Sequence, residues 1–196
     1  MNRETLSYYE ENAESYANST RNVEMKDIRE KFTSLLNPSS YILDFGCGSG
    51  RDTKAFINQG FKVSALDGSK RLCEIASEFT GIKIEHILFQ EFKENKIYDG
   101  IWACSSLLHL TYEELKVVFR NLKGSLKKDG ILYISFKYGT KDVFVGKRYY
   151  TNMDERRIQD LIHEIGGFSL IEIWYSSSKI PENNEKWMNI ILKKYE

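Results

Sequence analysis

The stretch LDFGCGSGRDT, residues 43–53, decides the fold, because three glycines alternate with other residues directly after an apolar run. Glycine costs backbone entropy wherever it sits, so three within five positions indicate a turn or a close approach that side chains would prevent. The pattern predicts a strand at residues 41–44 before the glycines and a helix at residues 53–59 after them. In open α/β sheets, ligands bind at such turns, at the carboxyl ends of strands.

Strand and helix patterns continue to alternate beyond this turn. They predict strands at 62–67, 83–88, 100–103 and 131–136, with helices at 70–79 and 112–126. A helix at 153–165 is followed by strands at 168–175 and 187–192, which a loop containing Pro181 joins without a full helix, so we expect antiparallel pairing. The sequence therefore predicts an α/β fold: a Rossmann-like, doubly wound, mostly parallel seven-stranded sheet with an antiparallel last strand.

Two helices are predicted on the N-terminal side of the sheet. Leu6, Tyr9, Ala13 and Tyr16 recur at spacings of three and four, and residues 25–35 keep the same period until the helix ends before Pro38. We expect one domain over residues 1–196. It divides into an N-terminal helical lid (1–37), a cofactor-binding half (38–136) and an acceptor-side half (137–196).

Composition narrows the class of protein. Lys plus Arg and Asp plus Glu balance at 28 each, which argues against nucleic acid as a partner. No apolar run is long enough for a membrane helix, and the N-terminus is too acidic for a signal peptide. Three cysteines without a CxxC pair predict reduced thiols, a cytoplasmic location and no metal site.

The residues around the glycines select among three ligands. A P-loop requires Gly-Lys-Ser/Thr, whereas the chain has Gly50-Arg51-Asp52, and the third glycine comes too early for a dinucleotide-binding turn. Asp52 is also expected to repel a phosphate at the helix N-terminus. S-adenosylmethionine carries no phosphate: Asp44 can take its ammonium group, and Asp67, at the end of the next strand, can reach its ribose hydroxyls.

LDFGCGSG, together with ALDGS at residues 65–69, resembles the class I S-adenosylmethionine-dependent methyltransferases over roughly residues 5–140. The N-terminal tyrosines resemble the helical lid of small bacterial members, including the tellurite-resistance type. The resemblance implies S-adenosylmethionine as cofactor and S-adenosylhomocysteine as product, with residues 90–92 facing adenine and residues 102–110 covering the methionine end. The predicted cofactor-binding residues are Tyr16, Asp44, Gly46, Cys47, Gly48, Gly50, Arg51, Asp52, Asp67, Gly68, Ser69, Glu91, Phe92, Cys104 and Ser105.

The acceptor side offers fewer signals. His109, just past the fourth strand, is the candidate general base, or else a histidine hydrogen-bonded inside the wall of the pocket. Aromatic and basic residues after the fifth strand can bind an acceptor by stacking and charge, or form a solvated loop. The predicted acceptor-binding residues are Tyr8, Lys137, Arg148 and Tyr149.

The predicted reaction is an in-line displacement that moves the methyl group from sulfur to a small-molecule acceptor. The chain lacks the Asn/Asp-Pro-Pro-aromatic stretch of amino-methylating DNA enzymes after its fourth strand, and it lacks a Pro-Cys nucleophile. Two alternatives remain open. One is a non-catalytic cofactor-binding module, and the other is an RNA or protein methyltransferase with a basic rim at residues 141–157. We expect a monomer or a homodimer.

Overall fold

The computed structural model describes residues 2–179 and 185–195 of the chain. Pro181, expected in the loop between the last two strands, lies outside this range. Within the described residues, no helix combines the length and the apolar character that crossing a bilayer requires.

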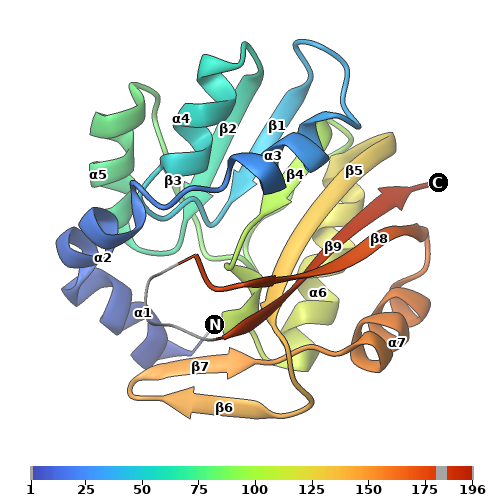
Figure 1. The fold of residues 1–196 in the computed structure, drawn as a ribbon. Coiled ribbons are helices and arrows are strands. Elements are labelled where there is room, and N and C mark those ends of the chain that lie inside the picture. The colour runs from blue at the N-terminus through green and yellow to red at the C-terminus, as the bar shows by residue number, and fades with distance from the viewer. Residues whose placement is uncertain (1, 180–184, 196) are drawn as a thin grey trace.

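One seven-stranded sheet runs through the molecule in the order β3-β2-β1-β4-β5-β9-β8 (Figure 1). Strands β1 to β5 pair in parallel, and β9 lies antiparallel between β5 and β8. The predicted doubly wound sheet is therefore confirmed. Its strands are β1 (Tyr41–Phe45), β2 (Lys62–Asp67), β3 (Glu85–His86), β4 (Tyr98–Ala103), β5 (Leu126–Lys137), β8 (Phe168–Ser177) and β9 (Lys186–Lys194).

Helices cover both faces of this sheet, as Figure 1 shows. On one face lie α6 (Tyr112–Ser125) and α7 (Glu155–Ile165), and on the other α3 (Lys26–Thr33), α4 (Arg51–Asn58) and α5 (Lys70–Thr80). Phe32 of α3 packs against Trp102 of β4 at 5.3 Å between ring centroids. Gly100 makes room for it, since a Cβ there would lie 2.7 Å from the Phe32 ring.

Local sequence signals explain where several helices begin. Thr111 and Glu114 form the expected capping box before α6, and Ser69 Oγ caps α5 by accepting a hydrogen bond from Leu72 N at 3.1 Å. Helix α4 begins at Arg51, two residues before the predicted start. Gly50 adopts φ +77° as its N-cap, so the helix follows the glycine turn without a linker.

The N-terminal segment forms two short helices, α1 (Arg3–Glu11) and α2 (Ala13–Thr20), where one continuous helical stretch was expected. They separate at Asn12, whose side-chain amide donates to the carbonyl oxygen of Tyr8 at 2.8 Å and competes with regular helix bonding. Both helices pack on α5, where the Glu10 carboxylate accepts a hydrogen bond from Ser69 Oγ at 2.6 Å.

Several strands also differ from the sequence prediction. Strand β3 is two residues long instead of six, and β5 begins at Leu126, where the helix was expected to end. A hairpin of β6 (Asp142–Val145) and β7 (Arg148–Thr151), turning at Gly146 with φ +59°, was not predicted. The hairpin contacts α1 through Thr5 Oγ1, which donates to Lys147 O at 3.4 Å and accepts from Tyr149 N at 3.0 Å.

Shortening Phe32 to alanine is expected to destabilise the fold by about 3–5 kcal/mol, because it leaves a cavity between α3, α4 and β4. Urea unfolding followed by circular dichroism measures the loss. The matched control is Leu35→Ala, two residues beyond α3 and 44% exposed, which should change the free energy of unfolding by no more than about 0.5 kcal/mol. Equal losses in both variants would contradict this packing role.

Candidate active site

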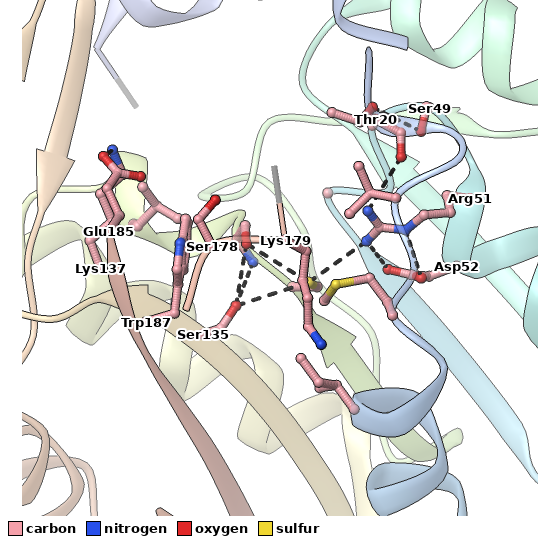
Figure 2. Close-up of a pocket in the computed structure, with 18 of the residues that line it drawn as sticks. Thr20, Ser49, Arg51, Asp52, Ser135, Lys137, Ser178, Lys179, Glu185 and Trp187 are labelled. Carbon is pink, nitrogen blue, oxygen red and sulfur yellow. Dashed lines mark hydrogen bonds and ion pairs between the residues drawn. The ribbon is translucent and has the colours of Figure 1, made fainter. Parts of the chain in front are cut away.

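A cavity of about 320 Å³ lies at the carboxyl ends of β1 and β4, where the strand order reverses. A smaller cavity of about 40 Å³ adjoins it beneath α1 and α2. Figure 2 shows Lys137, Glu185 and Trp187 on one side of the large cavity and Thr20, Ser49, Arg51 and Asp52 on the other. The two sides come from opposite halves of the sequence.

The glycine turn forms the floor of both cavities. Gly46 has φ +83°, and a Cβ on it would lie 2.4 Å from Ser106 Cβ, so no other residue fits there. Gly48 has φ +54° and faces the lid, where the Tyr16 ring would lie 3.2 Å from an added Cβ. The turn is held by Leu66 O, which accepts from the backbone N–H of Gly46 at 2.9 Å.

Asp44 lies at the end of β1, buried at the edge of the large cavity. Its Oδ2 accepts a hydrogen bond from Thr53 Oγ1 at 2.6 Å. Burial, and then the nearby charge of Asp52, raise the pKa of Asp44 to about 7. A cation bound beside this carboxyl group would favour its ionised form and lower its pKa again.

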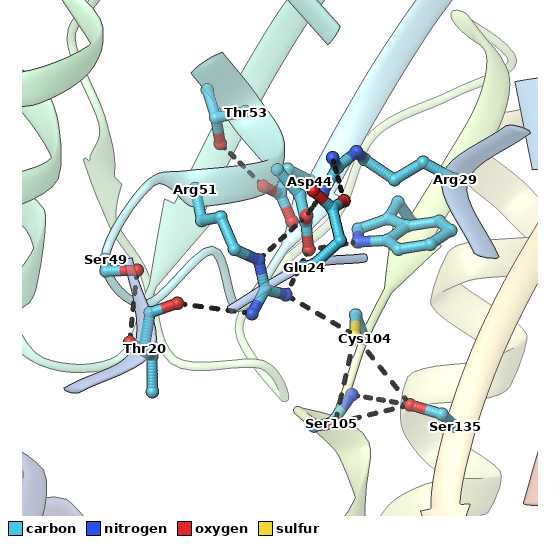
Figure 3. Close-up of polar contacts among 12 residues, drawn as sticks. Thr20, Glu24, Arg29, Asp44, Ser49, Arg51, Thr53, Cys104, Ser105 and Ser135 are labelled. Carbon is cyan, nitrogen blue, oxygen red and sulfur yellow. Dashed lines mark hydrogen bonds and ion pairs between the residues drawn. The ribbon is translucent and has the colours of Figure 1, made fainter. Parts of the chain in front are cut away.

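Asp52 is the centre of a buried ionic cluster with Arg29 and Arg51, both labelled in Figure 3. Its carboxylate receives Arg29 Nη1 and Arg51 Nη2, each at 2.7 Å, and the indole N–H of Trp102 at 3.0 Å. Although burial raises the pKa of Asp52, Arg51 and Arg29 hold it below its ordinary value. Arg29 also lies 3.7 Å from a carboxylate oxygen of Glu24, so two guanidinium groups face two carboxylates here, and the expected repulsion of a phosphate by Asp52 stays a prediction.

Asp67 lines the smaller cavity at the end of β2. Its two oxygens accept from the backbone N–H groups of Gly48 and Ser69, both at 2.9 Å, and burial raises its pKa. The carboxylate therefore also fixes the glycine turn. Its role in binding ribose hydroxyls stays a prediction.

Ten of the predicted cofactor-binding residues line the cavities: Tyr16, Asp44, Gly46, Cys47, Gly48, Arg51, Asp52, Asp67, Cys104 and Ser105. The structure does not bring Gly50, Gly68, Ser69, Glu91 and Phe92 into either lining. Phe92 packs in the core against Phe45 at 5.2 Å, and Glu91 is exposed. Phe89 lies beside Gly46 in the smaller cavity instead.

The cysteines at the site are neutral thiols. Burial raises the pKa of Cys47 above its ordinary value and that of Cys104 to about 11. Cys104 Sγ lies 4.0 Å from Arg51 Nη2. The next residue, Ser105, has φ +54° and donates its backbone N–H to Ser135 Oγ at 2.9 Å, which turns the chain away from β4 at the cavity.

His109 lies in the wall of the cavity with both ring nitrogens in hydrogen bonds. Nδ1 is 2.8 Å from the carbonyl oxygen of Tyr149, and Nε2 is 2.8 Å from the hydroxyl of Tyr9. Since a carbonyl oxygen only accepts, Nδ1 carries the proton and Nε2 accepts from Tyr9. Burial lowers the pKa of His109 to about 4, so the ring is neutral. Its predicted role as a base stays a prediction, and any proton must reach it through Tyr9.

The acceptor side combines β5, β7 and β9. Lys137 and Arg148 line the large cavity, whereas Tyr8 and Tyr149 do not. Tyr149 supplies its backbone oxygen to His109, while its hydroxyl donates to Asp142 Oδ2 at 2.7 Å. Sequence reasoning missed the cavity residues Tyr9, Thr20, Trp187 and Asn189. Of these, only Tyr9 had a signal in the sequence, because it follows Tyr8 directly. Its place on the apolar face of the predicted helix, however, indicated a packing role.

A family model of a methyltransferase domain matches residues 17–174, well over half of the chain. This chain belongs to the methyltransferase domain family. The resemblance to class I S-adenosylmethionine-dependent methyltransferases is thereby confirmed.

Relatives with similar sequences match stretches of different length in this chain. It is 32% identical over 130 residues to a ubiquinone biosynthesis O-methyltransferase of Rickettsia felis, which covers 63% of this chain and 52% of that protein. It is 27% identical over 184 residues to an uncharacterized methyltransferase of Geobacillus sp., which covers 79% and 86% of the two chains. The chain thus spans about half the length of the ubiquinone biosynthesis relatives it matches.

Solved structures share the fold of this methyltransferase. The 1,6-didemethyltoxoflavin-N1-methyltransferase of Burkholderia thailandensis superposes with a TM-score of 0.78 at 18% identity, covering 97% of this chain and 85% of its own. A TehB-like methyltransferase of Corynebacterium glutamicum gives a TM-score of 0.73 at 18% identity, covering 94% and 98%.

Affinity of the methyltransferase for S-adenosylhomocysteine is expected to rise with pH up to about 7. Asp44 must ionise to hold the ammonium group, and its pKa of about 7 in the empty site falls once that cation binds. The dissociation constant should be roughly tenfold higher at about pH 6 than at about pH 8. Isothermal titration calorimetry measures this. In Asp44→Asn, binding should be weaker and should lose the titration, whereas an unchanged pH profile would refute the assignment.

Gly48→Ala is expected to weaken S-adenosylhomocysteine binding at least about tenfold, because the new Cβ displaces Tyr16 from the turn. Gly60→Ala is the matched control: Gly60 has φ +86° but no atom within 4 Å of an added Cβ. Both variants carry about 1–2 kcal/mol of backbone strain, which thermal unfolding detects. Only Gly48→Ala should lose affinity. Equal affinities would show that contact with Tyr16 is irrelevant to binding.

Proposed function

We propose that this chain transfers the methyl group of S-adenosylmethionine to a small-molecule acceptor. One observation carries the proposal: Asp44 and Asp67 end neighbouring strands on either side of a glycine turn that forms the floor of a cavity. Two carboxyl groups with raised pKa suit a ligand that brings an ammonium group and two hydroxyl groups.

Each end of the cofactor has suitable partners in the cavity. Asp44 would hold the ammonium group and Asp67 the ribose hydroxyls. Arg51 lines the same cavity and offers guanidinium donors for the carboxylate. Phe89, beside Gly46, offers an apolar surface in the smaller cavity. The cofactor supplies a sulfonium-bound methyl group, and the protein supplies alignment.

Methyl transfer needs little chemistry from the side chains. A bond forms between the acceptor atom and the methyl carbon while the carbon–sulfur bond breaks, and a neutral thioether leaves. The proton of a hydroxyl acceptor becomes strongly acidic as that bond forms. A weak base such as His109, with a pKa of about 4, can take such a proton late in the reaction.

Tyr9 is the link between acceptor and His109. Its hydroxyl donates to His109 Nε2 and accepts from Arg148, so one lone pair is left to accept from an acceptor in the cavity. The acceptor proton would move to Tyr9 as the Tyr9 proton moves to His109, and Tyr9 stays neutral throughout. This agrees with the burial that raises the pKa of Tyr9 well above its ordinary value.

The acceptor class follows from the enclosure of the cavity. Helices α1 and α2 and the β6–β7 hairpin border it, which leaves room for a small molecule and supports residues 1–37 as a lid over the cofactor half (38–136) and the acceptor half (137–196). The Burkholderia relative in fold holds a small molecule, 1,6-didemethyltoxoflavin, with S-adenosylhomocysteine. We infer a cytoplasmic enzyme, a monomer or homodimer, that acts on no nucleic acid.

Incubation with methyl-labelled S-adenosylmethionine and a bacterial cell extract, separated afterwards into small molecules, RNA and protein, tests the proposal. Label is expected in a low-molecular-mass product. Tight cofactor binding without any product would favour a non-catalytic module. Label in RNA or protein would favour an RNA or protein methyltransferase.

Tyr9→Phe is expected to lower kcat about 100-fold in this assay while leaving the affinity for S-adenosylhomocysteine nearly unchanged, because only the hydroxyl is lost. His109→Asn should have a similar effect, and the double variant should be no slower than either single one. Multiplying effects in the double variant would show that the two side chains act separately.

A further inference from the structure

Arg148 brings an unusual charge into the acceptor side of the cavity. It begins strand β7, and its guanidinium carbon lies 4.6 Å from the ring centroid of Tyr8 and 5.6 Å from that of Tyr150. Its Nε atom is buried and has no hydrogen-bond partner within the described residues. A buried donor without a partner is costly, so it indicates a group that the ligand completes.

The other cations that line this cavity are already neutralised. Arg51 pairs with Asp52 at 2.7 Å, Lys137 with Glu185, and Lys179 with Asp27 at 3.1 Å. Arg148 makes no ion pair with a carboxylate in the part of the chain that the structure describes. Within the described residues, one positive charge therefore remains without a carboxylate partner next to the space for the acceptor.

The environment of Arg148 defines the shape of its ligand. The rings of Tyr8 and Tyr150 lie within cation–π distance of the guanidinium, and Tyr9 accepts a hydrogen bond from it, while Nε has no hydrogen-bond partner among the described residues. A carboxylate matches the planar fork of donors with two parallel hydrogen bonds. A phosphate monoester brings close to two charges and would call for a second unpaired cation, which this side of the cavity lacks among the described residues.

The position of Arg148 relates this charge to the reaction. Its cation opposes the rise in the pKa of Tyr9, so the guanidinium lies close to the hydroxyl that is proposed to receive the acceptor proton. A ligand held by Arg148 is therefore brought beside Tyr9 in the same cavity.

We propose that the acceptor is a small organic carboxylate, and that Arg148 binds its carboxylate while the methyl-accepting atom lies toward Tyr9. This rests on the proposed methyl transfer and specifies its substrate class. Arg148 acts here as a specificity-determining residue, and its loss should affect acceptor use without affecting the cofactor.

The test uses methyl-labelled S-adenosylmethionine and one bacterial small-molecule extract divided in two halves. Carboxylates in one half are first converted to amides with carbodiimide and ammonia. The wild-type protein should label a product that an anion-exchange resin retains, and amidation should reduce that label at least about tenfold. Arg148→Gln should cause a similar loss with the untreated half.

Lys147→Gln is the matched control, because it removes the neighbouring positive charge of the hairpin, which pairs with Glu11 at 3.0 Å outside the cavity. Its labelling should equal that of the wild type, and both variants should bind S-adenosylhomocysteine with wild-type affinity in calorimetry. If the labelled product is uncharged or cationic, and Arg148→Gln labels it as strongly as the wild type does, this inference is overturned while the proposed methyl transfer stands. No label in any fraction, or no binding of S-adenosylhomocysteine by the wild type, removes the proposed function and this inference with it.

Discussion

The site depends on one buried carboxylate, Asp52, and on the charges that compensate it. An unpaired carboxylate at this depth would cost several kcal/mol, so Arg29 of α3, Arg51 of α4 and the Trp102 indole of β4 must all stay close. This one group therefore joins the helix before the sheet, the glycine turn and the central strand. It also holds the guanidinium of Arg51 at the cavity, and its negative charge contributes to the raised pKa of Asp44.

A second set of contacts joins helix α1 to the β6–β7 hairpin in the cover over the cavity. Tyr9 of α1 bonds to His109, His109 to the backbone of Tyr149, and Thr5 to the same hairpin strand. The lid and the hairpin are thus one hydrogen-bonded unit, although more than 130 residues separate them in sequence. In the proposed function, this cover would shield a reaction whose chief requirement is alignment.

The sequence predicted the parts of the fold that local periodicity specifies. Alternating strands and helices and the capping box of Thr111 gave the sheet and its order of elements, and the glycines with Asp44 and Asp67 gave the cofactor side. The hairpin escaped prediction because residues 142–151 carry charges and aromatics without a clear period, and their pairing follows from docking on α1. The sequence prediction named Phe92 and missed Phe89, because sequence position does not reveal which ring turns toward Gly46.

By itself the sequence determined the doubly wound sheet, the turn that only glycine can form, and the acids at the ends of two neighbouring strands, because these properties depend on residues close together in the chain. Only the tertiary structure decided that Asp52 is paired with two guanidinium groups, that His109 bonds to Tyr9, and that Arg148 has no carboxylate partner among the described residues. Each of these depends on which distant side chains share a buried volume, and burial sets the cost of every charge within it.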